Sequence, residues 1–558
     1  MAERPRRRLA FIAGLSLLVS LVLVGQLVQV QLFRHAELVQ AAEDLYTRRG
    51  EIAPLRGRIY DQRGHLVAGN QVEYEVSVTP ELVADPVAVA VRLAPLLQRD
   101  PLSLWEAIAR QQRWVLLAPR VEKSVGEKIA DLGLAGVNVV PRWRRIYPEG
   151  TLGAHLLGFV NAEQVGYYGV EGFYQQELAG SQGTRVDRRD PYGGRIPLSL
   201  AQGDPPRPGA DLVLTVDWTV QAVVEAELDR ALEETGAEQG CIIVMDPRTG
   251  RILALAARPT YDPNRYFEAE ERQFVNLAVG AQYEPGSVFK ILTMAVALER
   301  GLVTPESGYQ DQGEIEVGGQ VIRNWDRQAY GWVTMADVLA YSLNVGVARL
   351  ATLLGPPAFY QGIRAFGIDR PTGVDLEGEV AGELRLPSDP TWHESDLGTN
   401  AFGQGLAVTP LQMIAAVAAV ANDGLLMRPY VVAEQRWPDG RVIRARPVVQ
   451  GRAISQETAR TLTQMLVEAV AREVPQAQVE GYAIAGKTGT AQVPIPGGYD
   501  PQQTIASFVG YGPAEDPRLI ILVRLDKPKS SPWGSQTAAP VFGRLAARLF
   551  ILLGIPPS

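Results

Sequence analysis

Ser287 and Lys290 are the two residues whose types and spacing most directly suggest a reaction. They begin the most apolar helical pattern of the chain, predicted over 288–300, so Ser287 is expected at a helix N-terminus, where unpaired backbone N–H groups can stabilise a developing oxyanion. Positions i and i+3 share one face of a helix, and a buried amine with a lowered pKa can accept the proton of a nearby hydroxyl. The pair therefore suggests a serine nucleophile with a lysine base.

On its own this spacing is weak evidence. Average composition predicts more than one Ser-x-x-Lys by chance in 558 residues, and such a pair also fits a solvated helix face. A serine nucleophile here would need a base other than histidine, because none of the four histidines has the sequence context of a serine protease. They are His35, His65, His155 and His393.

Two further motifs make the catalytic interpretation stronger. Ser342-Leu-Asn344 falls between two predicted helices, and Lys487-Thr-Gly-Thr490 lies in a predicted strand whose small residues would let another backbone approach. A hydroxyl at 342 and an amide at 344 can relay protons and hold a substrate amide. Lys487, Thr488 and Thr490 can hold a carboxylate.

The distribution of lysine supports this interpretation. The chain has 54 basic residues, of which six are lysines, at positions 123, 128, 290, 487, 527 and 529. Two of the six fall in the motifs, although arginine serves as the cation almost everywhere else. Arginine cannot be deprotonated in a protein, so a general base at these positions could not be arginine.

The elements that must position these motifs lie in the C-terminal part of the chain. The segments 242–255 and 508–525 each contain two apolar runs separated by a turn sequence. They therefore predict two β-hairpins. Between them the sequence predicts helices over 288–300, 335–341, 410–421 and 455–471, the second with Thr334 and Asp337 spaced as a capping box. Strands at both ends and helices between them favour an antiparallel sheet flanked by helices.

The remaining sequence predicts an anchor and a separate module. Residues 9–33 form an uncharged segment that is long enough for a transmembrane helix. The arginines before this segment make the tail 1–8 cytoplasmic by the positive-inside rule. Residues 45–205, with helices near 103–109 and 123–132, predict an extended α+β module, and the turn-rich segment 202–209 places a boundary near 205. The stretch 545–555 contains Arg548 and favours an amphipathic terminal helix.

Composition excludes several classes of protein. A net charge of −8 disfavours a nucleic-acid-binding surface. One cysteine, Cys241, cannot form an intramolecular disulfide, and with four histidines it leaves too few ligands for a zinc cluster. No cofactor or metal is expected.

In their order, Ser287-x-x-Lys290, Ser342-x-Asn344 and Lys487-Thr-Gly489 resemble the three motifs of penicillin-binding transpeptidases and serine β-lactamases. The surrounding sequence is similar to class B penicillin-binding proteins over nearly the whole chain, and closer to division-type than to elongation-type members. The segments that carry this similarity are Arg56-Gly-x-Ile-x-Asp61-x-x-Gly64, Tyr147-Pro-x-Gly150, Met245-Asp-Pro-x-Thr-Gly250, Tyr283-Glu-Pro-Gly-Ser287 and Phe402-Gly-Gln-Gly-x-x-Val-Thr-Pro-Leu411.

The resemblance implies a multidomain α+β protein. Its parts would be a transmembrane helix at 9–33, a pedestal or dimerisation domain at 45–205 and a transpeptidase domain at 206–558 with a five-stranded antiparallel sheet flanked by helices. The sequence leaves no room for the glycan-polymerising domain of class A members.

The resemblance also implies the chemistry. Ser287 would attack the D-Ala-D-Ala carbonyl of a peptidoglycan stem peptide, and the acyl group would pass to an amine of a neighbouring peptide, while β-lactams would inhibit covalently. Lys290 would be the base, and the backbone N–H groups of Ser287 and Thr490 would form the oxyanion hole. The resemblance further implies that Ser342, Asn344 and Lys487 are catalytic residues around this pair. The residues that it implies for substrate binding are Thr488, Gly489 and Thr490.

Three hypotheses remain open. The first is a cross-linking transpeptidase. The second is a D,D-carboxypeptidase or β-lactamase-type hydrolase, against which the anchor and the pedestal argue. The third is a non-catalytic scaffold or β-lactam sensor, against which the intact motifs argue.

The resemblance implies a location and partners. The protein would be a single-pass protein of the bacterial cell membrane with its catalytic domain outside. It would contact the membrane, a polytopic glycan polymerase and other divisome or elongasome proteins, but no nucleic acid. Gln26, Gln29 and Gln31 near the outer end of the anchor either lie at the wet interface or hydrogen-bond a second membrane helix.

His155 and Glu171 in the first module have residue types that can bind a metal. Packing or contacts that join domains are the favoured interpretation.

Overall fold

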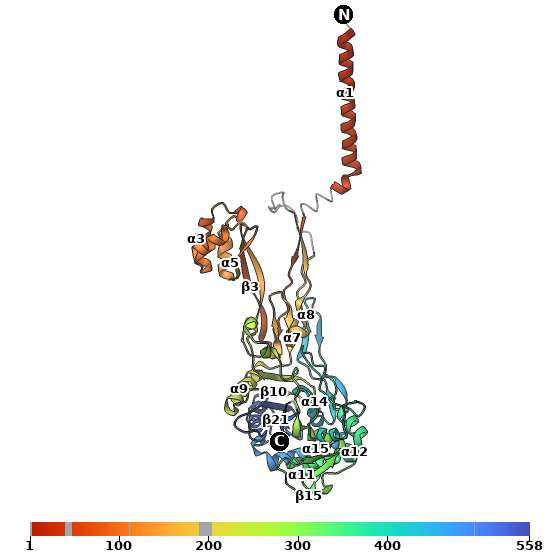
Figure 1. The fold of residues 1–558 in the computed structure, drawn as a ribbon. Coiled ribbons are helices and arrows are strands. Elements are labelled where there is room, and N and C mark those ends of the chain that lie inside the picture. Colours follow the sequence, from red (N-terminus) through yellow and green to blue (C-terminus); the bar gives the residue numbers. More distant parts are fainter. Residues whose placement is uncertain (1–2, 39–46, 111, 189–203, 496, 558) are drawn as a thin grey trace. The chain divides into compact units, whose positions relative to one another are not determined.

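The computed structural model describes residues 3–38, 47–110, 112–188, 204–495 and 497–557 (Figure 1). Its contacts divide the chain into two compact units. The first comprises Met1–Leu55 with Gly180–Pro208, and the second comprises Arg56–Ala179 with Gly209–Ser558. All three motifs lie in the second unit. Of the predicted linker 202–209, residues 202 and 203 lie outside the described residues.

The first unit contains the apolar N-terminal helix and a short β-ladder. Helix α1 (Glu3–Val28) continues into a π-helical turn at Gln29–Phe33. Within the described residues, Arg8–Phe33 is the one helix long and apolar enough to cross a membrane, with a mean hydropathy of 2.4. This confirms the predicted helical segment, which fits a membrane anchor. Strand β1 (Thr47–Ile52) pairs antiparallel with β8 (Gly183–Arg188).

A five-stranded antiparallel sheet forms the centre of the C-terminal part of the second unit, in the order β11-β10-β22-β21-β20. Both predicted hairpins are confirmed, and they come together because β10 pairs with β22. The strands are β10 (Gln239–Met245), β11 (Ile252–Arg258), β20 (Ala485–Ile495), β21 (Gly498–Gly512) and β22 (Leu519–Asp526). Strand β20, which contains Lys487 to Thr490, lies at one edge of the sheet.

Alternation along the strands explains why helices cover both faces of this sheet. Along β10, Ile242 and Val244 belong to one hydrophobic cluster, while Ile243 and Met245 belong to another. Since successive side chains point to opposite faces, both faces are buried. Helices α9 (Trp218–Thr235) and α16 (Ala538–Leu552) contribute to the first cluster, and α10 (Lys290–Glu299) and α14 (Pro410–Ala421) contribute to the second. Helix α16 confirms the predicted terminal helix but begins earlier.

The four helices predicted with bounds between the hairpins are confirmed, whereas the helix after Ser342 was predicted without bounds and the helix at 394–400 was not predicted. The capping box at the start of α11 (Met335–Ala340) is present, since Thr334 Oγ1 accepts from the Asp337 backbone N–H and the Asp337 carboxylate accepts from the Thr334 N–H. The others are α12 (Asn344–Ala365), α13 (Glu394–Asn400) and α15 (Gln456–Glu473). Short strands between them are β12 (Gly308–Asp311), β13 (Glu314–Val317), β14 (Gln320–Arg323), β15 (Gly331–Thr334), β16 (Leu425–Met427) and β19 (Val449–Arg452).

The N-terminal part of the second unit is an α+β lobe on a long sheet. Strand β3 (Leu66–Val78) pairs with β4 (Val115–Glu122) and β5 (Val137–Ile146). Near its start β3 also pairs with β2 (Ile59–Tyr60). From β2 the sheet continues, strand by strand, with β9 (Asp211–Leu214), β17 (Val432–Arg436) and β18 (Val442–Arg444). Helices α3 (Pro86–Leu97), α4 (Pro101–Ile108) and α5 (Lys123–Asp131) pack on the lobe. The last two confirm the predicted helices. Shorter elements are α6 (Ala154–Leu157), β6 (Phe159–Val160), β7 (Gly166–Tyr167), α7 (Gly169–Phe173) and α8 (Gln175–Ala179).

Glu171 holds this region together. Its buried carboxylate accepts hydrogen bonds from Arg56 Nε at 2.8 Å and Arg145 Nε at 2.6 Å. Burial alone raises the pKa of Glu171, but the two guanidinium groups together hold it below its usual range. His155 Nε2 lies 2.9 Å from the carbonyl oxygen of Pro259, and burial lowers its pKa to about 4. Both side chains therefore serve packing contacts, as favoured from the sequence.

Candidate active site

Ser287 lies in a tight turn that leads into a buried helix. A 3₁₀ turn at Gly286–Phe289 precedes α10, so the α-helix starts later than the sequence predicted. Gly286 has φ +56°, and a Cβ there would lie 3.1 Å from the Thr490 carbonyl oxygen. Only glycine permits both this conformation and this close approach. The turn therefore places Ser287 directly beside strand β20.

The Ser287 side chain is half-buried and faces a cavity of about 300 Å³. Among the described residues its Oγ makes no hydrogen bond, which leaves it available to a ligand. The expected hydrogen bond between Ser287 Oγ and Lys290 Nζ is not formed. The lysine amine instead contacts Ser342 and Asn344.

Lys290 is completely buried. Its Nζ lies 2.5 Å from the Ser342 carbonyl oxygen, 2.7 Å from Asn344 Oδ1 and 3.2 Å from Ser342 Oγ. Burial, reinforced by the positive charge of Lys487, lowers the pKa of Lys290 well below its ordinary value. A neutral amine has two N–H donors and one lone pair. If the two oxygens at 2.5 and 2.7 Å take the donors, the lone pair is left for a hydroxyl.

Ser342 and Asn344 occupy the junction between α11 and α12, as predicted. Ser342 has φ +58°, a left-handed conformation that is uncommon for a residue with a side chain. Asn344 Nδ2 donates to the Arg323 carbonyl at 3.0 Å, so its Oδ1 points to Lys290. The strained backbone therefore aims both a carbonyl and a hydroxyl oxygen at one amine.

Lys487 lies across the cavity on β20. It is buried, and burial lowers its pKa to about 8, with Glu473 acting in the opposite direction. Its Nζ lies 3.3 Å from Thr488 Oγ1. The two lysines thus differ: Lys290 is driven toward the neutral form, while Lys487 retains most of its charge near pH 7.

Gly489 and Thr490 bring the edge strand against the serine turn. A Cβ at Gly489 would lie 2.9 Å from the Pro285 carbonyl and 2.3 Å from Ser507 Oγ, so no side chain fits there. Thr490 Oγ1 accepts from the Gly534 N–H at 3.0 Å, and within the described part of the chain its own hydrogen has no acceptor. An edge strand has unpaired backbone groups on its outer side, so a peptide can add to β20 as a further strand.

Aromatic side chains at the cavity were not found from the sequence. Trp325 and Trp533 meet edge to face with ring centroids 5.3 Å apart, and Tyr330 stacks on Tyr341 at 5.5 Å. All four line the same cavity as Ser287. Trp325 and Tyr330 lie in the loop between β14 and β15, Tyr341 is the C-cap of α11, and Trp533 lies in the loop before α16. Aromatic residues at such scattered positions carry no periodic signal that would have marked them.

Helices cover both faces of a five-stranded sheet, and a serine turn and a Lys-Thr-Gly edge strand meet at one cavity, where a buried lysine bonds the lining residue Ser342. This combination defines the penicillin-binding transpeptidase class. Residues 240–547 match the family described as "Penicillin binding protein transpeptidase domain", and residues 51–214 match the "Penicillin-binding Protein dimerisation domain".

Individual relatives agree with these matches. The chain is 34% identical to stage V sporulation protein D of Bacillus subtilis, over 99% of this chain and 86% of that protein. It is 30% identical to peptidoglycan D,D-transpeptidase FtsI of Escherichia coli, over 99% of this chain and 92% of that protein. Among solved structures, a peptidoglycan synthetase from Bifidobacterium adolescentis has a TM-score of 0.75 at 28% identity, over 92% of this chain and 98% of that chain. Penicillin-binding protein 3 of Mycobacterium tuberculosis, in complex with aztreonam, has a TM-score of 0.71 at 28% identity, over 91% of this chain and 98% of that chain.

The chain belongs to the class B penicillin-binding proteins, of the division and sporulation type.

Proposed function

We propose that this protein is a serine D,D-transpeptidase that cross-links peptidoglycan stem peptides and is inhibited covalently by β-lactams. One observation carries the proposal: a half-buried serine hydroxyl, unpartnered among the described residues, faces a cavity that Ser342 and Lys487 also line. The buried Lys290 amine, whose pKa lies well below its ordinary value, contacts Ser342. The names of the relatives support the same activity.

In the first step Ser287 Oγ attacks the carbonyl carbon of the penultimate D-alanine. Lys290 Nζ accepts the hydroxyl proton directly or through Ser342 Oγ, which lies 3.2 Å from it. The backbone N–H groups of Ser287 and Thr490 stabilise the oxyanion. The C–N bond then breaks, the proton passes to the leaving nitrogen, and D-alanine departs.

The other motif residues position the substrate. Lys487, Thr488 and Thr490 hold the terminal carboxylate, and Gly489, which lets the serine turn lie against β20, keeps this substrate-binding strand beside Ser287. Asn344 orients Lys290 and can hold a substrate amide. In the second step an amine of a neighbouring stem peptide attacks the ester, and Ser287 regains its proton.

Acceptor dependence separates this function from hydrolysis. We expect the full chain in detergent, given a D-Ala-D-Ala stem-peptide donor and an amine acceptor, to form a cross-linked product. Mass spectrometry would quantify cross-linked and hydrolysed products as acceptor concentration rises. Release of D-alanine with hydrolysed donor alone, at every acceptor concentration, would identify a carboxypeptidase instead.

The pH dependence of acylation tests the role of Lys487. Because its pKa is about 8, its charge is present below that pH and is lost above it. Acylation by benzylpenicillin, whose carboxylate this charge would hold, should therefore fall as pH rises above about 8 when measured from about pH 6.5 to about 9.5.

Lys487→Arg is the matched variant, since arginine stays charged over this range. The alkaline fall should disappear in this variant. An unchanged alkaline fall would assign it to another group.

The anchor sets the location that we propose. The arginine-rich tail 1–8 would stay in the cytoplasm and the catalytic domain would lie outside the membrane. The domain limits 45–205 and 206–558 belong to the same proposal, as do a polytopic glycan polymerase and other divisome or elongasome proteins as partners.

A further inference from the structure

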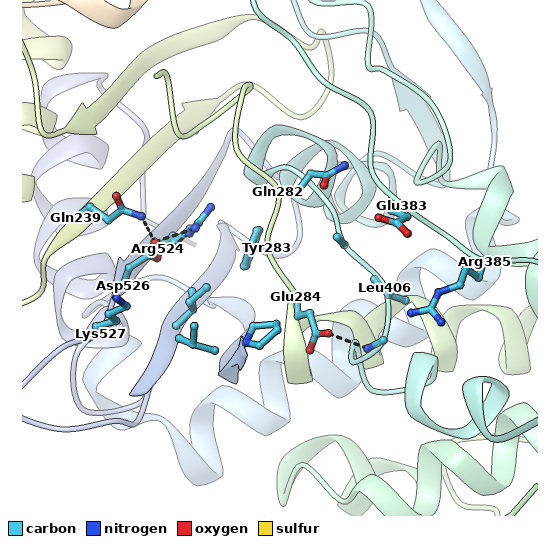
Figure 2. Close-up of a pocket in the computed structure, with 15 residues that line it drawn as sticks. Gln239, Gln282, Tyr283, Glu284, Glu383, Arg385, Leu406, Arg524, Asp526 and Lys527 are labelled. Carbon is cyan, nitrogen blue, oxygen red and sulfur yellow. Dashed lines mark hydrogen bonds and ion pairs between the residues drawn. The ribbon is translucent and has the colours of Figure 1, made fainter. Parts of the chain in front are cut away.

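The buried carboxylates of the second unit are of two kinds. Glu171 and Asp526 face arginines; Figure 2 shows Asp526 beside Arg524, whose Nε and Nη2 each bond it at 2.8 Å. Asp311 belongs to the other kind, since it is 1% exposed and, in the described part of the chain, its carboxylate is hydrogen-bonded by neutral donors alone. A carboxylate is costly to remove from water, so a buried one held in this way calls for an explanation.

Asp311 ends strand β12 and bonds three neighbouring groups. Its Oδ1 accepts from the Tyr309 hydroxyl, and its Oδ2 accepts both from Asn324 Nδ2 and from the Tyr330 backbone N–H, all at 2.9 Å. An ionised carboxylate only accepts hydrogen bonds, so each of these groups must turn a donor toward it. Asn324 and Tyr330 connect Asp311 with the active site, whereas Tyr309 does not line the cavity of Ser287.

Asn324 transmits the constraint to helix α12. It is 2% exposed, and since its Nδ2 faces Asp311, its Oδ1 is left to accept the Val345 N–H at 3.2 Å. That N–H belongs to the first turn of α12, where helix geometry leaves donors without intrahelical partners. The carbonyl of the preceding residue, Arg323, accepts from Asn344 Nδ2 at 3.0 Å. Two consecutive residues therefore hold the first two residues of α12.

This arrangement decides which atom of Asn344 meets the base. With its Nδ2 held by Arg323, its Oδ1 lies 2.7 Å from Lys290 Nζ and accepts one of the N–H groups there. A reversed amide would instead turn Nδ2 toward Lys290, donate to the lone pair of the neutral amine and occupy it. The lone pair would then be unable to take the proton of Ser287, so the base depends on the position of Asn344.

The bond to Tyr330 holds the neighbouring wall of the cavity. The Tyr330 ring stacks on Tyr341, which directly precedes Ser342, and both rings line the cavity of Ser287. Asp311 thus joins this wall and the start of α12 to one buried carboxylate.

We propose that Asp311 is a positioning residue for acylation, which keeps Asn344 Oδ1 on Lys290 Nζ through Asn324. Asp311 lies outside the three motifs and does not line the cavity, so it acts only through other residues. The inference rests on the proposed function and extends it by one residue.

Two substitutions separate the arms of this network. Asn324→Ala removes the bond that leads to α12, whereas Tyr309→Phe removes the hydroxyl bond to Asp311 and keeps the ring. With the full chain in detergent, rapid-quench acylation by benzylpenicillin gives both the rate constant of acylation and the dissociation constant of the initial complex. We expect Asn324→Ala to lower the rate constant at least about tenfold, and by more than it changes the dissociation constant, while Tyr309→Phe stays within about threefold of the wild type.

Substitutions of Asp311 itself test the same point. The oxygen of Asp311→Asn can accept from Asn324 and Tyr330 while its amide nitrogen donates to the Tyr309 hydroxyl oxygen, so the rate constant should stay within about threefold of the wild type. Asp311→Leu has a similar size but accepts no hydrogen bond, and it should lose at least as much as Asn324→Ala.

Asp375→Leu is the matched control for stability. Asp375 is also a buried carboxylate that accepts from one tyrosine hydroxyl and two backbone N–H groups, but its donors, Tyr174, Val431 and Val432, do not line the active-site cavity. This variant should unfold at a lower temperature, as Asp311→Leu does, and still be acylated at nearly the wild-type rate. An equal loss of acylation in both leucine variants would overturn the specific role of Asp311.

A double-mutant cycle tests the route through Asn344. If Asn324 acts by holding Asn344, Asn324→Ala should cause no further loss of acylation in an Asn344→Ala background. Losses that multiply would show two independent effects and would overturn the inference.

The outcomes distinguish the inference from the proposed function. A wild-type acylation rate in Asn324→Ala would overturn the inference and leave Ser287 as the nucleophile. Absence of a benzylpenicillin adduct on Ser287 in the wild type would overturn the proposed function itself. The comparison of Asn324→Ala with Tyr309→Phe decides the inference even if a leucine variant fails to fold.

Discussion

Ser287→Ala should abolish covalent labelling by a fluorescent penicillin. The substitution removes the only atom that we assign as nucleophile, so the acylation rate should fall by at least about 10⁴-fold. The Ser287 Oγ makes no hydrogen bond among the described residues, so the loss should leave stability unchanged. Gel fluorescence, peptide mapping of the wild-type adduct and thermal unfolding measure these effects.

Ser530→Ala is the matched control. Ser530 is exposed in the loop between β22 and α16, and its backbone N–H donates to the Thr235 carbonyl, a bond that alanine keeps. This variant should label like the wild type. Labelling that persists in Ser287→Ala, or an adduct mapped to another serine, would refute the assignment.

Local signals in the sequence explain why so many elements were predictable. The capping box at Thr334 and Asp337 and the Ser455 N-cap of α15 involve residues three apart or fewer, so the sequence alone specifies them. Helix α9 was not predicted, although Asp217 caps its start and Gly236 ends it in a left-handed conformation. The same local signals were therefore present there.

The pairing of strands that are far apart in the chain could not be predicted from the sequence. Strand β9 pairs in parallel with β2 and antiparallel with β17, which are far apart in the sequence. The short apolar runs of these strands fit many partners, because strand register depends on tertiary contacts. The sequence therefore indicated an extended α+β module without specifying its sheet.

The composition of the site was predicted, but its internal contacts were not. The sequence placed Ser287 beside Lys290 by helical spacing, whereas Lys290 Nζ contacts Ser342 and Asn344. That contact depends on the left-handed backbone at Ser342, a conformation that tertiary packing imposes on a residue that rarely adopts it.

Lys290→Arg should reduce acylation by roughly a thousandfold, within the range of a general base. The substitution keeps a positive charge but removes the buried amine that contacts Ser342 and that burial drives toward the neutral form. A guanidinium cannot accept the proton of Ser287 at any pH at which the protein is folded. Rapid-quench measurement of benzylpenicillin acylation gives the rate.

Arginine is larger than lysine, so a steric effect must be separated from the loss of the base. Lys290→Met has nearly the same volume as lysine and no charge, and it should lose acylation to a similar extent while unfolding at a temperature close to that of the wild type. If the base is what matters, both variants fail at every pH, because neither has an amine to titrate. An acylation rate for Lys290→Arg within about tenfold of wild type, a cost of about 1.4 kcal/mol, would instead make Lys290 an electrostatic residue and leave the proton of Ser287 to another group.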